Sequence, residues 1–140
     1  MKRTASARYE GLGKAGKGHV STQSGVLADS PYGFNTRFED EPGTNPEELV
    51  AAAHAACFTM ALSFALAKAG HADGTLDTQA AVTLDKDGDG FTVTRSDLTL
   101  TASVPGIDAA EFEKIANEAK ANCPISKLLK AEITLTTALK

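Results

Sequence analysis

The chain has 140 residues, a length that fits a single domain spanning 1–140 with a core large enough to need no disulfide. Hydrophobic residues make up 42% and charged residues 23% of it, which is typical of a soluble globular protein. Its net charge of −4 and its scattered lysines and arginines argue against a nucleic-acid-binding protein.

The first residues, from Met1 to Ser6, contain no apolar run, so the sequence predicts no secretory signal and a cytoplasmic location. Thiols are kept reduced in the cytoplasm, and structural disulfides are rare there. The chain has two cysteines, Cys57 and Cys123. We interpret them either as buried core residues, which counting alone favours, or as redox-active thiols.

Three extended segments are predicted in the N-terminal part of the chain. Residues 3–10 and 17–24 have the pattern of strands and are joined by a turn rich in glycine and lysine. Residues 33–38 are expected to form a third strand, with Phe34 and Phe38 on one face and Arg37 on the other. On this pattern alone Arg37 is a surface charge.

A long helix is predicted after these segments, with Asn45 as N-cap, Pro46 at the first position and Glu48 completing a capping box. Residues 49–67 contain no Asp, Glu, Lys or Arg, and alanine is the commonest residue among them. A helix that is apolar all round is buried, either in a protein core or in a membrane. Because alanine contributes little transfer energy and polar residues interrupt the run, we favour a buried central helix and no membrane span.

A pair of strands is predicted next, at residues 76–84 and 91–102, because apolar residues alternate in both. The alternation changes parity between Thr94 and Asp97, which predicts a β-bulge. The intervening turn matches the first half of a calcium-binding loop at Asp85, Asp87 and Asp89. The loop's closing glutamate is replaced by Ser96, so we interpret this stretch as a polar hairpin turn.

The C-terminal part is predicted to hold two helices and a last strand. One helix starts at Asp108, with Glu111 three residues later as a capping partner. A short helix follows Cys123 at 124–129, and residues 133–139 alternate as a strand. The predicted fold class is α+β, with about six antiparallel strands around a long buried central helix.

Local sequence leaves the chemistry of the cysteines open. Cys57 lies in an apolar helix, where burial disfavours the thiolate unless a fixed cation reaches it. Cys123 precedes Pro124 at a helix start, where free N–H groups favour an anion, so Cys123 is expected to be the more acidic thiol. His54 and Cys57 offer only two zinc ligands, and no second pair occurs. We interpret His54 as a core histidine with satisfied hydrogen bonds.

Several segments nevertheless form a specific pattern in a fixed order, at residues 32–38, 43–49, 53–62, 104–108, 122–126 and 129–135. In these segments the chain resembles the OsmC/Ohr family of organic hydroperoxide reductases, nearly end to end. Residues 32–38 and His54 favour the OsmC branch over the Ohr branch.

The resemblance implies a peroxidase of oxidative and osmotic stress defence that reduces organic hydroperoxides, and hydrogen peroxide more slowly. It implies that Cys57 is the peroxidatic cysteine, Cys123 the resolving cysteine, and Arg37 and Glu47 the pair that activates Cys57. It further implies an intertwined homodimer, no metal or bound cofactor, and reduction by dithiols, including those of lipoyl proteins. Glu48 is interpreted only as a capping residue.

The spacing of Glu47 and Cys57 predicts where the site lies. The two residues are ten positions apart in one predicted helix, about 15 Å along the axis and about 80° apart around it. An arginine that pairs with Glu47 cannot easily reach Cys57 of the same chain across this separation. We therefore expect each active site to combine Glu47 of one chain with Cys57 of a second chain. The alternatives from other classes are a stress protein that binds hydrophobic small molecules or lipids without turnover, and a structural stress protein.

Overall fold

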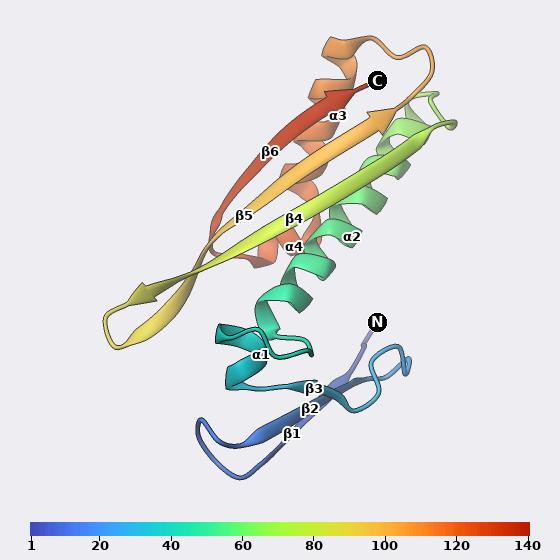
Figure 1. Cartoon of the computed structure of the whole chain (residues 1–140). Helices are drawn as coiled ribbons and strands as arrows, with labels where there is room; N and C mark the ends of the chain where they lie inside the picture. The colour runs from blue at the N-terminus through green and yellow to red at the C-terminus, as the bar shows by residue number, and fades with distance from the viewer. The chain divides into compact units, whose positions relative to one another are not determined.

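The computed structural model describes residues 1–140, which divide into two units, Met1–Leu49 and Val50–Lys140. The first holds a small sheet and a short helix, and the second holds the larger sheet and most of the long helix (Figure 1). The expectation of one domain spanning 1–140 stays a prediction.

The first unit is built on a three-stranded antiparallel sheet with the strand order β1-β2-β3. The strands predicted at 3–10 and 17–24 are confirmed with slightly shorter bounds. The chain reverses between these two strands at Gly11 and Gly13, whose φ angles are 69° and 78°. Glycine adopts positive φ without strain. The elements are β1 (Ala5–Glu10), β2 (Lys17–Thr22), β3 (Ser30–Tyr32) and α1 (Phe34–Phe38).

The prediction of a strand at 33–38 is wrong, because residues Phe34–Phe38 form the helix α1. The Thr36 hydroxyl accepts a hydrogen bond from the Gly33 N–H at 2.8 Å and lies 3.1 Å from the Gly33 carbonyl, which closes the helical turn. Phe34 and Phe38 then lie one turn apart, with ring centroids separated by 5.1 Å. Their spacing satisfies a helical contact as well as a strand alternation.

The long helix α2 (Pro46–Lys68) begins where the sequence predicted. The side chain of Asn45 accepts a hydrogen bond from the Glu48 N–H at 2.8 Å, which confirms Asn45 as the N-cap. The second half of the expected capping box is absent. The Glu48 carboxylate instead accepts a hydrogen bond from the Thr44 hydroxyl at 2.8 Å.

The second unit contains a three-stranded sheet with the order β4-β5-β6. The pair β4/β5 is antiparallel, but β6 is parallel to β5, so the expectation of a wholly antiparallel set of strands is wrong (Figure 1). Two helices lie between β5 and β6 in the chain and form a crossover that lets β6 run in the same direction as β5. The elements are β4 (Thr75–Asp87), β5 (Gly90–Ser103), α3 (Ala109–Asn122), α4 (Pro124–Leu128) and β6 (Glu132–Leu139).

Two further predictions for the β4/β5 hairpin are confirmed. Thr83 pairs with Arg95 and Leu84 pairs with Val93, so Thr94 is the extra residue of a β-bulge. Asp87 pairs with Gly90, which makes the acidic stretch a hairpin turn. Its carboxylates accept hydrogen bonds from strand hydroxyls, Asp85 from Thr94 and Asp87 from Thr92.

The core of the second unit lies between the sheet and the helices α2 and α3. Phe58 of α2, Leu100 of β5 and Phe112 of α3 are each at most 1% exposed. The other members of this core include Leu62, Leu66, Leu98, Ala102, Val104, Ala116, Ala119 and Cys123. The Asp108 carboxylate caps α3 by accepting from the Ala110 and Glu111 N–H groups, as predicted.

The long helix is buried along one face only, so the expectation that it is buried all round is wrong for the single chain. The buried stripe is His54, Phe58, Leu62 and Leu66, at helical spacing. Met60 is 61% exposed and Phe64 is 70% exposed on the remainder. By length and composition alone α2 is able to cross a membrane. Its polar His54 is nevertheless anchored in the core of a sheet and helices, as in a soluble protein.

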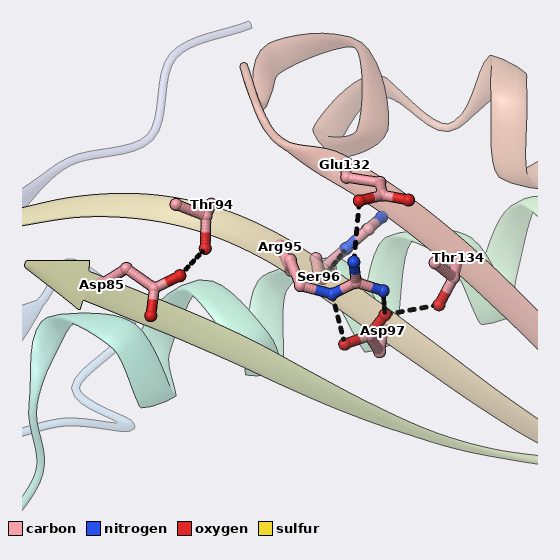
Figure 2. A network of polar contacts seen from close by, with 8 residues as sticks. Asp85, Thr94, Arg95, Ser96, Asp97, Glu132 and Thr134 are labelled. Carbon is pink, nitrogen blue, oxygen red and sulfur yellow. Dashed lines mark hydrogen bonds and ion pairs between the residues drawn. The ribbon is translucent and has the colours of Figure 1, made fainter.

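A polar network joins β5 to β6 on the outside of the sheet (Figure 2). Arg95 contacts the Glu132 carboxylate at 2.7 Å and the Asp97 carboxylate at 2.9 Å. The Thr134 hydroxyl donates to the same Asp97 carboxylate at 2.5 Å. Since Arg95 pairs with Glu132 and Asp97 with Thr134 in the strand register, the contacts reinforce the parallel pairing.

We expect the Asp97→Asn variant to lose stability at neutral pH. The hydrogen bonds from Arg95 and Thr134 hold the pKa of Asp97 below its ordinary value. A carboxylate with a lowered pKa in the folded state stabilises the protein above its unfolded-state pKa of about 4, and this contribution is lost as the pH falls through the folded-state value.

Urea unfolding at a series of pH values checks this prediction. The difference in unfolding free energy between the wild type and Asp97→Asn is expected to be largest near neutrality and to shrink below about pH 4. Asp77→Asn, an exposed change on β4 of the same sheet, is the control. A difference that stays constant over the whole pH range contradicts the prediction.

Candidate active site

In the first unit, Arg37 of α1 and Glu47 in the first turn of α2 form an ion pair. The Arg37 Nε lies 3.0 Å from one Glu47 carboxylate oxygen and 3.1 Å from the other, and Nη2 contacts the first oxygen as well. The Glu47 side chain is only 13% exposed. A guanidinium held by two oxygens has a fixed orientation, so its charge has a fixed position.

A cavity of about 290 Å³ opens beside Arg37, and four of its nine lining residues are aromatic. The rings of Tyr9 and Tyr32 meet edge to face at a centroid distance of 6.0 Å. The lining residues are Tyr9, Gly13, Lys14, Tyr32, Gly33, Phe34, Arg37, Phe38 and Pro46. Apolar walls next to a fixed cation suit a ligand with a hydrocarbon part and a polar or anionic end.

In the second unit, the two cysteines lie against each other. Cys57, in the middle of α2, is half-buried, and Cys123, between α3 and α4, is fully buried. The two thiols influence each other's pKa values, and the backbone N–H of Ile125 acts to lower both. Two thiols that interact in this way are candidates for a disulfide with each other.

The two thiols of this pair are not equivalent. Burial, and then the hydrogen bond with Cys123, raise the pKa of Cys57. Burial also acts to raise the pKa of Cys123, but the hydrogen bonds from Cys57, from the N–H groups of Ser126 and Ile125 and from the Ser126 hydroxyl outweigh it, so the net shift is downward. The pKa of Cys123 is thus shifted downward and that of Cys57 upward, which is the order of acidity that the sequence predicted.

His54 is a fully buried core histidine with both ring nitrogens hydrogen-bonded, as predicted. Nδ1 lies 2.6 Å from the Ser96 hydroxyl and Nε2 lies 2.8 Å from the Ser126 hydroxyl. Neither serine was predicted to be a partner of His54. The sequence did offer one signal for Ser126, because a residue three positions after Cys123, in the first turn of the predicted helix, lies close to that cysteine.

No group of three or more His, Cys, Asp and Glu side chains is placed to hold a metal ion. The candidate residues therefore fall into two pairs of side chains, Arg37 with Glu47 in the first unit and Cys57 with Cys123 in the second. The pairing of each was not evident from local sequence, because its members are ten and sixty-six residues apart.

These features define an α+β protein with a contacting pair of thiols and a fixed arginine–glutamate pair. Residues 38–138 match the family described as OsmC-like protein, and the chain belongs to that family. It is 59% identical over 134 residues to Peroxiredoxin OsmC of Escherichia coli (strain K12), covering 96% of this chain and 94% of the relative. The resemblance seen in the sequence is thereby confirmed.

More distant relatives agree with this assignment. The chain is 30% identical to the Organic hydroperoxide resistance protein OhrB of Bacillus subtilis (strain 168), covering 88% of this chain and 89% of the relative. The crystal structure of OhrB of Bacillus subtilis superposes with a TM-score of 0.71, covering 100% of this chain and 98% of that one. An OsmC-like protein of unknown function from Vibrio cholerae, 16% identical, has a TM-score of 0.78 with 99% of each chain covered and shares the fold.

Proposed function

We propose that this chain is a thiol-dependent peroxidase that reduces organic hydroperoxides to alcohols, and hydrogen peroxide more slowly, in stress defence. Its family and its relatives named as a peroxiredoxin and as organic hydroperoxide resistance proteins support this function. The single observation that carries it is the interaction between the thiols of Cys57 and Cys123, which shifts their pKa values in opposite directions. A contacting pair of thiols is what a two-cysteine peroxidase cycle requires.

The proposed cycle has three balanced steps. The Cys57 thiolate attacks one oxygen of the hydroperoxide, the O–O bond breaks, and the leaving alkoxide takes a proton to become the alcohol. Cys57 is left as a sulfenic acid. Cys123 attacks that sulfur, a disulfide forms and water leaves. An external dithiol then reduces the disulfide by exchange and is itself oxidised.

The first step requires a cation near Cys57. Cys57 is influenced by burial, by Cys123 and by the Ile125 N–H, none of which carries a positive charge, and its pKa is raised. We assign the missing cation to Arg37, held in place by Glu47. A fixed guanidinium beside the sulfur would stabilise the thiolate, and the aromatic cavity next to Arg37 would bind the alkyl part of the substrate.

The spacing along α2 supports a site shared between two copies of the chain. Glu47 and Cys57 are ten residues apart in this one helix, about 15 Å along its axis. In an antiparallel pair of α2 helices, the start of one would approach the middle of the other. Met60 and Phe64 expose apolar side chains on α2, which supports the proposal that a second copy of the chain packs against this face of the helix. A homodimer that buries about 800 Å² per chain would cover them.

The remaining assignments follow from the proposed chemistry. The cycle needs no metal or bound cofactor, because sulfur carries the electrons in every step. A dithiol such as a lipoyl group is the reductant that we propose, since it closes to a cyclic disulfide when oxidised. The reducing cytoplasm is the compartment that would sustain it, and residues 1–140 would act as one functional domain.

The count of free thiols after oxidation tests the proposal. One equivalent of an alkyl hydroperoxide added to the reduced protein is expected to remove both thiols, because the sulfenic acid at Cys57 condenses with Cys123. Added dithiol is expected to restore both. A protein that only binds hydrophobic molecules would keep both thiols, and that result would exclude the peroxidase.

A further inference from the structure

The buried polar chain that includes His54 has no part in the cycle described above. His54 is fully buried, and so is Ser96, which contacts its Nδ1 at 2.6 Å. Ser126, which is 9% exposed, contacts its Nε2 at 2.8 Å. The residues come from three separate elements, α2, β5 and α4. Burying an imidazole and two hydroxyls costs free energy unless all their hydrogen bonds are made, so this arrangement requires a reason.

Ser126 connects this polar chain to the thiol pair. Ser126 lies in the first turn of α4, three residues after its N-cap Cys123; the Ser126 hydroxyl lies 2.8 Å from His54 Nε2 and helps to lower the pKa of Cys123. A serine hydroxyl has one hydrogen to donate. When Cys123 is a thiolate, which only accepts, that hydrogen is directed to the sulfur. The Ser126 oxygen must then accept its second hydrogen bond from His54 Nε2–H.

We propose that His54 is a positioning residue that acts through Ser126, orienting the Ser126 O–H toward Cys123 and so stabilising the thiolate with which Cys123 attacks oxidised Cys57. The attack forms the S–S bond, breaks the S–O bond of the sulfenic acid, and releases hydroxide that takes a proton to become water. The proposal rests on the proposed function only in naming Cys123 as the attacking thiol of this step.

The direction of every hydrogen bond in the chain follows from this arrangement. With Nε2 protonated, a neutral His54 has an acceptor at Nδ1, and Ser96 donates its hydroxyl hydrogen there. Burial lowers the pKa of His54, which keeps the ring neutral. The hydrogen bonds therefore run in one direction, from Ser96 to His54, from His54 to Ser126, and from Ser126 to Cys123. Successive bonds of one direction strengthen one another.

The ionisation of Cys123 tests the proposal without any need for peroxidase activity. In the full-length Cys57→Ser protein, Cys123 is the only thiol, and its thiolate is followed by ultraviolet absorbance during a pH titration. We expect Ser126→Ala to lower the ratio of thiolate to thiol at fixed pH by about tenfold, the effect of losing one hydrogen bond to an anion. Ser126→Thr retains the hydroxyl and is expected to restore the ratio to within about twofold.

A double-mutant cycle separates positioning from simple structural support. If His54 acts through Ser126, His54→Leu is expected to lower the ratio of thiolate to thiol at Cys123 when Ser126 is present. In the Ser126→Ala protein, His54→Leu is expected to have no further effect on that ratio. His54→Gln, whose amide provides a donor, is expected to recover part of the loss. A folded Ser126→Ala protein with an unchanged ratio overturns the proposal. An equal effect of His54→Leu in both backgrounds overturns it too.

A spectroscopic measurement on the Cys57→Ser protein adds a test that needs no change in the polar chain. Nitrogen NMR distinguishes the two neutral tautomers of a histidine. Above the pKa of Cys123, His54 is expected to carry its proton on Nε2, and a proton on Nδ1 contradicts the proposal. Suppose that the titrations and the NMR measurement give the expected results while the wild type fails to consume hydroperoxide. In that case the proposed function is wrong and the positioning role of His54 stands.

Discussion

Replacement of Cys57 by serine is expected to abolish peroxide reduction, so that the rate of hydroperoxide consumption falls to that of the uncatalysed reaction. A serine hydroxyl has no accessible anionic form at neutral pH and no redox chemistry of its own, so the attacking atom is lost. Cys57 is the half-buried member of the thiol pair, whereas Cys123 is fully buried. We therefore expect a peroxide to reach Cys57 before Cys123. The measurement is consumption of an alkyl hydroperoxide in the presence of a dithiol.

The companion change, Cys123→Ser, is expected to have a different result. Cys57 still reacts with about one equivalent of hydroperoxide, but the sulfenic acid has no internal partner. A 1,3-diketone that traps sulfenic acids, followed by mass spectrometry, is expected to label Cys57 in this variant. The wild type is expected to give little label, because the disulfide forms first.

The opposite assignment of the two thiols is a serious competitor, because Cys123 has the lower pKa. If acidity decided the roles, Cys123 would attack the peroxide and Cys57 would resolve. A Cys57→Ser protein that consumes one equivalent and carries its label on Cys123 would establish that opposite order. Access favours Cys57 in the thiol pair, and the proposed cation at Arg37 would remove the acidity difference.

Mixing two inactive variants is expected to restore activity if sites are shared between chains. Glu47→Gln removes a carboxylate that holds Arg37 by two oxygens, and we expect a loss on the order of 100-fold, as for a misplaced charged group at a reaction centre. Cys57→Ser lacks the attacking sulfur. Unfolded together and refolded, the two chains form heterodimers in which one site has intact Glu47 from one chain and intact Cys57 from the other.

The expected recovery has a defined size and a defined control. Random mixing at equal amounts places half of the chains in heterodimers, and each heterodimer has one complete site in two, so about a quarter of the wild-type activity is expected. The control is Glu48→Gln. The Glu48 carboxylate is next to Glu47 in the sequence but accepts a hydrogen bond from Thr44 and not from Arg37, so this variant is expected to stay active. Verified heterodimers without activity would exclude the shared site, and so would a fully active monomer.

Local sequence signals predicted the elements whose physics is local. The N-cap at Asn45, the cap at Asp108 and the bulge at Thr94 follow from side-chain hydrogen bonds and from alternation within a few residues, and all three are present. The stretch Phe34–Phe38 was misassigned because two phenylalanines four residues apart suit a helix as well as a strand. The hydrogen bonds between Gly33 and Thr36 decided between them.

The order of residues alone determined the α+β class, the long apolar helix and the family, and through the family it led to four proposed site residues. Tertiary structure decided which of them meet. Cys123 contacts Cys57 because the crossover through α3 and α4 returns the chain to α2, and the same path makes β6 parallel to β5. The contact of His54 with Ser126 and Ser96 has the same origin. Contacts between residues distant in sequence depend on packing of whole elements, and packing is absent from any local pattern.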